Sequence, residues 1–352
     1  MYVFMKKNYF FLHLLFWMCA SLFAQNKTIN QLGEVVVSDA KLQKFSGSQT
    51  ILTLNDSVIA HNQSLLTDLL QNNSVIYFKQ YGRGMLSTVS FRGTTASQTA
   101  VLWNGININS QMNGQTDFNT LSTQGYNSIA VKGGGGSILY GSGAIGGTVH
   151  LNDHLVFDSK WTHTLQYNYG IFNTQDVRFG IKGIRFNTQD LRFGTHYATK
   201  KLSVQVGFTQ NYSDNNYKYA GVFDWKGNQR YNLNGEYSLN TFNASLGYKF
   251  NTASILKFYS QYSITDRNLV VQSESESKAK YINAFSRNLI DFSTTFKRWN
   301  LDFKTAFLTE EYRYFADKEN DGYTFGKTQS VLGKADISYQ LGSGLVAHSL
   351  FD

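Results

Sequence analysis

The residues best suited to bind a ligand are the amides between Asn107 and Gln115. Asn and Gln side chains both donate and accept hydrogen bonds, so a cluster of them can hold a large polar molecule. The segment Tyr81-Gly-Arg83-Gly84 would form a neighbouring loop tip that carries a guanidinium group. Turn formation alone also explains the Asn and Gly residues, because both residue types favour turns. The candidate ligand-binding residues are Arg83, Asn107, Asn109, Gln111 and Asn113.

Other residue types that carry chemistry occur without the spacing that the chemistry requires. The glycine run from Gly133 to Ser137 could be mistaken for a phosphate-binding loop, but the Gly-Lys-Ser/Thr ending and the following helical pattern are missing. The seven histidines show no metal-type spacing, and no Ser/His/Asp set is supported. The formal charge of +8 is spread thinly along the chain, which argues against nucleic acid as a partner. We therefore expect a protein that is not an enzyme and has no cofactor.

A calcium site is a further possibility in the aromatic segment 211–228. Asp214 and Asp224 lie in this segment, and carboxylate oxygens are ligands that Ca²⁺ accepts. A solvated external loop is the simpler interpretation of the same residues. No other metal site is expected.

The N-terminus has the pattern of a signal peptide over residues 1–24. Two lysines precede an apolar stretch at 9–23, and Ala24 offers a small residue before a polar segment. The alternative is an N-terminal membrane anchor, but the apolar stretch is short for a bilayer span. The sole cysteine, Cys19, lies in this leader, so the mature chain would contain no thiol.

A polar extension at 25–48 follows the leader and contains one β-prone run, Glu34-Val35-Val36-Val37-Ser38. A flexible run of β-branched residues can add itself as a strand to the sheet edge of another protein, with main-chain hydrogen bonds supplying the affinity. The alternative interpretation of this run is a short strand that binds no other protein.

Residues 49–155 indicate a small α+β domain. The pattern predicts a helix at 64–70, capped by Ser64, whose apolar face is formed by Leu65, Leu66, Leu69 and Leu70. Glycine-rich turns separate the short strands that we expect. These strands lie at 75–78, 88–92, 100–103, 128–131 and 148–151.

Residues 160–352 show long runs in which apolar and polar side chains alternate. Such alternation predicts strands with one apolar and one polar face, and runs of about 9–11 residues suit tilted strands that cross a membrane. Abundant aromatics (Tyr 22, Phe 27) and few charged residues (16%) also fit a sheet that faces lipid. A soluble β-sandwich has shorter strands. The clearest runs are 161–171, 202–209, 242–250, 290–296, 299–307 and 331–341.

Four glycine-containing motifs between residues 87 and 153 occur in a characteristic order. They are Phe91-Arg92-Gly93, Val101-Leu-Trp-Asn-Gly105, Val131-Lys132-Gly133 with its glycine run, and Leu139-Tyr140-Gly141-Ser-Gly143-Ala-Ile-Gly146-Gly147. In this order and spacing they resemble the plug domain of TonB-dependent receptors. The resemblance implies an α+β plug followed by a transmembrane antiparallel β-barrel of the 22-strand type. The motif glycines are Gly93, Gly105, Gly133, Gly141, Gly143, Gly146 and Gly147.

The resemblance also implies partners and a role. Arg92 and Lys132 would pair with acidic residues on the inner wall of the barrel. Glu34–Ser38 would be the TonB box, which the C-terminal domain of the periplasmic TonB protein grasps. The receptor would lie in the outer membrane of a Gram-negative bacterium, surrounded by lipid, and would import a scarce nutrient such as cobalamin or a ferric siderophore.

The length departs from the family pattern. A barrel wide enough for a plug needs about 22 strands, whereas residues 160–352 supply only about eight or nine at membrane-spanning length. We therefore expect a truncated product or a fragment. Two further hypotheses are a non-transporting outer-membrane surface or adhesion protein, and a secreted β-sandwich enzyme that binds glycans.

Overall fold

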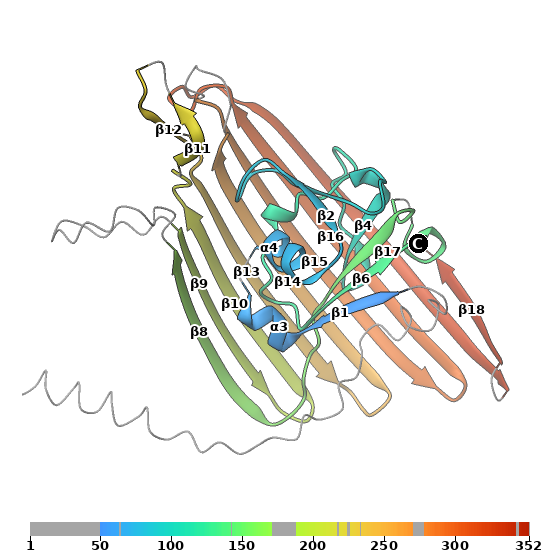
Figure 1. Ribbon diagram of the computed structural model, residues 1–352. Helices are drawn as coiled ribbons and strands as arrows, with labels where there is room; N and C mark the ends of the chain where they lie inside the picture. Colours follow the sequence, from blue (N-terminus) through green and yellow to red (C-terminus); the bar gives the residue numbers. More distant parts are fainter. Residues whose placement is uncertain are drawn as a thin grey trace, which may run out of the picture. The chain divides into compact units, whose positions relative to one another are not determined.

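The structure, a computed structural model, describes residues 50–62, 65–141, 143–170, 188–216, 218–223, 226–232, 234–269, 278–342 and 345–351. These residues form two regions that contact each other. Residues 50–153 form a small α+β domain, here called the plug, and residues 160–351 form a nine-stranded antiparallel sheet, here called the wall sheet (Figure 1). The predicted fold class is confirmed.

The plug is built around a five-stranded sheet with the order β1-β6-β7-β4-β5. Within it, β4 and β7 are parallel and the other pairs are antiparallel. Its strands are β1 (Ile51–Asn55), β4 (Thr99–Trp103), β5 (Ile106–Asn107), β6 (Ser128–Gly133) and β7 (Gly147–Asn152). A separate hairpin consists of β2 (Tyr77–Gln80) and β3 (Ser87–Ser90). The helices are α3 (Asp56–His61), α4 (Leu66–Asn73) and α5 (Ser137–Tyr140), with 3₁₀ turns η2 (Ala96–Gln98) and η3 (Phe118–Thr120).

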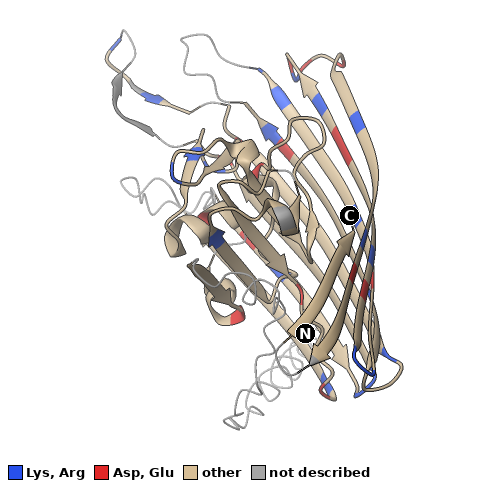
Figure 2. Ribbon diagram, turned by 90° about the vertical axis from the view of Figure 1, so that its right-hand side faces the viewer, with Lys and Arg blue, Asp and Glu red and all other residues tan. Residues whose placement is uncertain are grey.

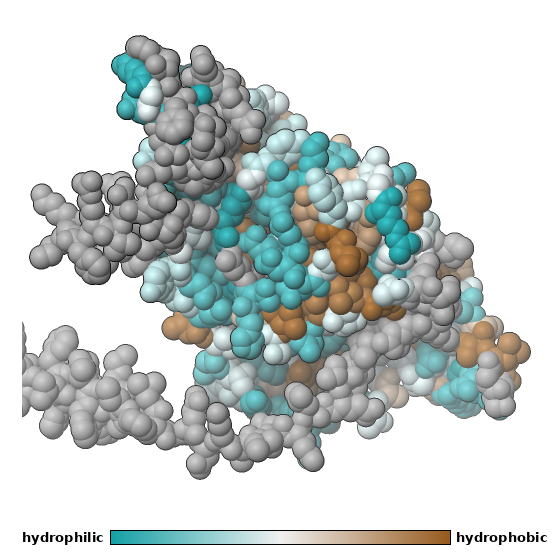
Figure 3. All heavy atoms as spheres, in the orientation of Figure 1, coloured by the Kyte–Doolittle hydropathy of each residue, from teal (hydrophilic) through white to brown (hydrophobic). Residues whose placement is uncertain are grey.

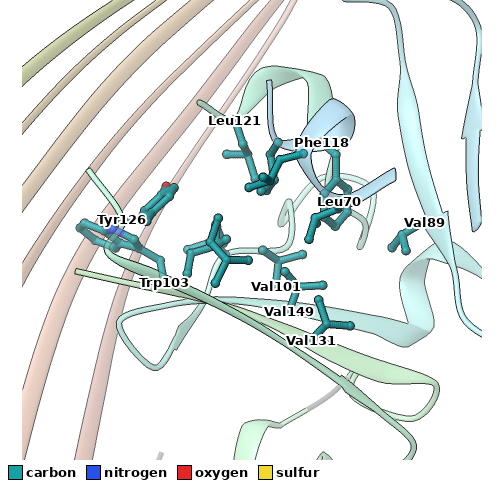
Figure 4. Packing of buried hydrophobic residues seen from close by; sticks show 14 of the residues in the cluster. Leu70, Val89, Val101, Trp103, Phe118, Leu121, Tyr126, Val131 and Val149 are labelled. Atoms are coloured by element: carbon teal, nitrogen blue, oxygen red, sulfur yellow. The ribbon is translucent and has the colours of Figure 1, made fainter. Parts of the chain in front are cut away.

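Helix α4 supplies much of the plug core. The four leucines predicted to form its apolar face are fully buried. Leu66, Leu69 and Leu70 pack among aliphatic residues of the sheet and the ring of Phe118 (Figure 4), whereas Leu65 packs with Met85 and with wall residues of β13. Full burial of one such side chain stabilises the fold by about 1.5–3 kcal/mol. The helix begins two residues later than predicted, with Leu65 in the N-cap position, and Ser64 lies outside the described residues.

The expected plug strands are present with shifted ends, but β1, β5 and helix α3 were not predicted. Helix α3 has only six residues and is capped by Asn55, whose side-chain oxygen accepts a hydrogen bond from the Val58 N–H at 3.1 Å. Two turns of helix are too short to show an apolar period, so this cap was the only available signal.

The wall sheet follows the chain order, with each strand pairing with its sequence neighbour. The exceptions are β11 (Lys218–Phe223) and β12 (Gln229–Tyr231), which lie between β10 and β13 in the sequence. Among the described strands they pair only with each other. The segment 211–228 is therefore not a simple loop, because it contains the end of β10, all of β11 and part of the connection to β12. The nine strands are β8 (Lys160–Gly170), β9 (Thr188–Ala198), β10 (Leu202–Ser213), β13 (Tyr237–Lys249), β14 (Ser254–Asn268), β15 (Lys280–Phe296), β16 (Trp299–Phe315), β17 (Thr324–Gly342) and β18 (Leu345–Phe351).

The two faces of the wall sheet differ in polarity. Phe208, Phe242 and Tyr262 lie side by side on three strands and point away from the plug, and Phe242 and Tyr262 are 45% and 49% exposed. The next row contains Asn243 and Gln261, which are buried. The predicted alternation is confirmed, and the apolar face of the wall sheet is the one turned away from the plug. The plug surface seen in Figure 3 is largely hydrophilic, with a smaller apolar patch.

The connections between strands are short at one end of the wall sheet and long at the other. At one end they span 199–201, 250–253 and 297–298, whereas at the other they span 214–236, 269–279 and 316–323. In outer-membrane barrels the short turns face the periplasm and the long loops face the outside.

Candidate functional site

A cavity of about 310 Å³ lies between a plug loop and the wall sheet. The plug contributes the loop at 108–120, and the wall contributes residues of β14, β15, β16 and β17. Arg267 and Tyr281, which line it, stand at the ends of β14 and β15 that lead to the long connection 269–279. The polar and charged residues that line the cavity include Asn109, Gln111, Asn113, Asp117, Arg267, Asn283, Arg287 and Glu310.

Three of the five predicted ligand-binding residues line this cavity. Asn109 is committed to the loop itself, because its side-chain oxygen accepts from Val101 N at 3.0 Å and its amide donates to the Thr99 carbonyl at 2.9 Å. Among the described residues, Gln111 and Asn113 make only local contacts, from the Gln111 amide to the Asn109 carbonyl at 3.4 Å and from Gln115 N to the Asn113 oxygen at 3.2 Å. Gln111 and Asn113 are therefore the amides best placed to reach a ligand, which stays a prediction.

Arg83 and Asn107 lie elsewhere. Arg83 forms an ion pair with Asp68 at 3.2 Å and donates from Nε to the Tyr237 hydroxyl of β13 at 3.1 Å. Its carbonyl oxygen accepts from the Asn215 amide at 2.6 Å. Asn107 accepts from Asn109 N at 3.0 Å and so shapes the loop. Both positions support a structural role, in which Arg83 joins the plug to the wall.

Several cations of the wall sheet bind plug carbonyl oxygens. Lys304 Nζ donates to the Asn104 carbonyl at 2.8 Å, and Lys334 Nζ donates to the Leu139 carbonyl at 3.1 Å. Arg192 donates in the same way to the Asn62 carbonyl, just after α3. Figure 2 shows the charges of the wall as separate bands on otherwise uncharged strands. Since these carbonyls belong to turns and helix ends, the wall satisfies acceptors that the plug's own secondary structure leaves unpaired.

The two basic residues predicted to reach the wall occupy different environments. Arg92 is exposed and has a φ of 47°. Lys132 is buried in β6, and its Nζ lies 5.8 Å from the ring centroid of Tyr140, also in the plug. Their pairing with acidic wall residues stays a prediction.

The motif glycines serve two geometric purposes. Gly93, Gly105, Gly141 and Gly143 have positive φ values, which other residues rarely adopt. Gly146 and Gly147 allow close approach, since a Cβ at Gly147 would lie 2.7 Å from the Lys132 carbonyl oxygen. A Cβ at Gly133, which faces Gly147 across the β6–β7 ladder, would meet nothing within 4 Å.

This difference between ladder partners makes a matched test. We expect Gly147→Ala to lower the free energy of unfolding of the plug by about 1–3 kcal/mol, because the new methyl group overpacks the backbone of β6. Gly133→Ala should be nearly neutral. The urea midpoint at which the plug becomes susceptible to protease measures both, and equal midpoints for the two variants would contradict the steric explanation.

Comparison with known proteins agrees with this architecture. Residues 41–148 match the TonB-dependent receptor plug domain. These residues are therefore a plug domain of the TonB-dependent receptor family. The receptor is 34% identical over 125 residues to the vitamin B12 transporter BtuB of Vibrio cholerae serotype O1 (strain M66-2), an alignment that covers 33% of this chain and 20% of BtuB. It is 32% identical over 91 residues to BtuB of Vibrio vulnificus (strain YJ016), which covers 26% of this chain and 15% of that protein.

Solved structures extend the likeness of fold to the wall sheet. The FrpB iron transporter from Neisseria meningitidis superimposes with a TM-score of 0.65 at 12% identity, covering 85% of this chain and 47% of FrpB. The siderophore receptor PiuA from Acinetobacter baumannii gives a TM-score of 0.60 at 10% identity, covering 84% of this chain and 43% of PiuA. The receptor chain thus spans less than half the length of these solved proteins, and its wall sheet matches part of their barrels.

A buried carboxyl group lies where the plug ends. Asp153 follows β7, and its Oδ2 accepts from the Ser245 hydroxyl of β13 at 2.5 Å. Its backbone N–H donates to the Asn104 side chain at 2.8 Å, and its carbonyl accepts from the Tyr259 hydroxyl at 3.3 Å. The other carboxyl oxygen, Oδ1, has no hydrogen-bond partner among the described residues. Burial raises the pKa of Asp153 to about 7, and the Ser245 hydrogen bond opposes that rise.

The remaining predicted residues are the run that resembles a TonB box and the two aspartates of the possible calcium site. Glu34–Ser38 and Asp224 lie outside the described residues, and Asp214 accepts a hydrogen bond from the Tyr212 hydroxyl at 2.5 Å. Within the described ranges, no three His, Cys, Asp or Glu side chains gather as metal ligands would. No helix in the part of the chain that the structure describes is long and apolar enough to cross a membrane.

Proposed function

We propose that this receptor binds a bulky, scarce nutrient of the cobalamin or ferric-siderophore type at the outer membrane and imports it with energy from TonB. The observation that carries the proposal is the cavity between the plug loop at 108–120 and the wall sheet. Its lining residues Arg267 and Tyr281 lie at the strand ends that lead to a long connection, which is the outer side under the rule for outer-membrane barrels. A ligand there would be in contact with the plug, the part of the receptor that blocks the lumen.

The chemistry of the cavity suits one portion of a large polar ligand. Its volume of about 310 Å³ is at the lower end of the range for ligand pockets, so a bulkier molecule would extend among the long loops. Amides, two arginines and the rings of Tyr281 and Phe285 line it, which gives both hydrogen-bonding and stacking surfaces. The similarity to vitamin B12 transporters and to siderophore and iron receptors supports the same ligand class.

Equilibrium binding tests this proposal. Outer membranes from cells that produce the receptor should bind cyanocobalamin or ferric enterobactin saturably. Gln111→Ala and Asn113→Ala should each raise the Kd about threefold to tenfold, the loss of one hydrogen bond. Asn251→Ala, a change in the short turn at the opposite end of the sheet, serves as the control.

The failure modes are distinct. Absence of saturable binding to either nutrient would contradict the ligand class. Binding that is indifferent to Gln111 and Asn113 would place the ligand away from this cavity. Binding without TonB-dependent uptake would favour the non-transporting surface protein.

A further inference from the structure

One ion pair in the cavity joins the wall directly to the plug. Arg267 of β14 contacts Asp117 of the plug, with a guanidinium nitrogen 2.6 Å from carboxylate Oδ2. A second guanidinium nitrogen of Arg267 donates to the Gly84 carbonyl at 3.4 Å. Both side chains line the cavity, so a bound ligand would touch this pair.

Asp117 is also an internal anchor of the plug. Its Oδ1 accepts from Ser87 N, at the start of β3, at 3.0 Å and from Asn119 N, in η3, at 3.1 Å. The Ser87 hydroxyl in turn accepts from Thr67 of α4 at 3.1 Å. The carbonyl of Leu121, just after η3, accepts from Leu66 N at the start of α4 at 3.1 Å. A single carboxylate thus connects the cavity to β3, η3 and α4.

Arg267 has bonding capacity left for a ligand. Its side chain is 5% exposed, and its Nε has no hydrogen-bond partner among the described residues. The guanidinium carbon lies 5.3 Å from the ring centroid of Tyr281, within the range of a cation–π contact. A planar guanidinium with a free N–H favours an anionic group with two acceptor oxygens, such as a carboxylate or phosphate.

We propose that Arg267 is a positioning residue that transmits occupancy of the cavity to the plug. An anionic group of the ligand draws the guanidinium away from Asp117 and so weakens the attachment of β3 and η3 to the wall. The proposal rests on the proposed function, because it assumes that the cavity takes the imported ligand. It also restricts that ligand to molecules with an exposed anionic group. That group must lie on the side of Arg267, because the acidic side chain of Glu310 of β16 lines the same cavity and would repel it.

The ligand and Asp117 compete for one cation, Arg267. A ligand shifts a conformational equilibrium only through unequal affinity for the two states. In the closed state, with the plug attached to the wall, the ligand must share Arg267 with Asp117. In the loosened state, with that ion pair broken, Arg267 is fully available to the ligand. A neutral ligand at the same place gains nothing from releasing Asp117 and would leave the plug as it is.

The test measures opening at Ser87, a fully buried residue that does not line the cavity. Ser87→Cys places the only thiol in the mature chain if the leader with Cys19 is removed. The rate of maleimide labelling in outer-membrane vesicles then reports exposure of this position. The receptor carries Arg267→Gln, Asp117→Asn, both changes, or the control Lys257→Gln, which removes another paired cation from β14. Each is measured in inorganic phosphate and in chloride at equal ionic strength.

We expect Arg267→Gln and Asp117→Asn each to raise the labelling rate about tenfold or more, with no further rise in the double variant. Phosphate should accelerate labelling of the parent and of Lys257→Gln but not of Arg267→Gln. Arg267→Lys, which keeps the charge, should stay near the parent rate and still respond to phosphate, which separates the relay from misfolding.

Labelling of Arg267→Gln at the parent rate, or an equal phosphate response with and without Arg267, would overturn the proposal. Since labelling needs no import, the two proposals fail separately. A receptor that opens with phosphate but binds neither cyanocobalamin nor ferric enterobactin keeps the relay and loses the proposed function. A receptor that binds nutrient through Gln111 and Asn113 while Arg267→Gln stays closed loses only the relay.

Discussion

Asp153→Asn should make the plug more stable at about pH 8 than the parent receptor, by up to about 4 kcal/mol. The reason is that burial raises the pKa of this carboxyl from 3.8 to about 7. Below about pH 4 the group is protonated in both the folded and the unfolded states and contributes no difference. Between about pH 4 and 7 only the unfolded state loses its proton, so the free energy of unfolding falls as the pH rises.

The size of the effect follows from the shift. A difference of roughly three pKa units corresponds to about 4 kcal/mol at 1.36 kcal/mol per unit. Asparagine keeps the shape of the carboxyl and does not titrate, so its variant should lack this loss of stability between about pH 4 and pH 8. Urea unfolding of the receptor in detergent, read by protease susceptibility of the plug, measures the slope.

Two serine variants show whether Asp153 is the responsible group. The Ser245 hydroxyl donates to the carboxyl and lowers its pKa, so Ser245→Ala should raise the pKa of Asp153 further and extend the loss of stability to higher pH. Ser263→Ala removes a hydroxyl on β14 that is buried against Thr241 instead and should leave the profile unchanged. A parent-like slope in Asp153→Asn would assign the pH dependence elsewhere.

The second large effect concerns the run Glu34–Ser38, the predicted TonB box. Deletion of Val35–Val37 should reduce uptake to the level of cells without the receptor while nutrient binding is retained. The physical reason is that strand addition relies on main-chain hydrogen bonds, which TonB would lose together with the segment. Uptake and equilibrium binding in the same membranes are the two measurements.

Two substitutions at one position test the mechanism more closely. Val36→Pro removes a backbone N–H and restricts the chain, so it should abolish uptake as the deletion does. Val36→Thr keeps a β-branched residue that favours strands, so uptake should persist. Equal uptake by the two variants would contradict strand addition, and normal uptake by the deletion would favour a surface protein that does not use TonB.

The plug–wall contacts give a physical account of how a plug can be both held and displaced. Lys304 and Lys334 bind carbonyl oxygens, and water can replace such a neutral acceptor without leaving an unpaired anion behind. The pair Arg267–Asp117 is different, because separation without a replacement leaves two charges in a partly buried site. An anionic ligand would supply that replacement for Arg267.

The sequence alone determined the kind of protein and the course of its strands. Period-2 alternation reports which face of a strand is apolar, and this property belongs to each strand separately, so the wall strands β8, β10, β13, β16 and β17 were foreseeable. The glycine motifs were equally local, since positive φ values and a missing Cβ are properties of single positions. The burial of Leu69 and Leu70 followed from helical spacing in the same way.

Tertiary structure decided which side chains meet. Arg267 lies 150 residues after Asp117 in the sequence, and Ser245 lies 92 residues after Asp153. No periodicity encodes such pairs, because they depend on the register of β13 and β14 and on where the plug rests against them. The contacts of Lys304 and Lys334 with plug carbonyl oxygens could not be foreseen either, because every residue possesses a backbone carbonyl and no residue type reveals which of them a cation will reach.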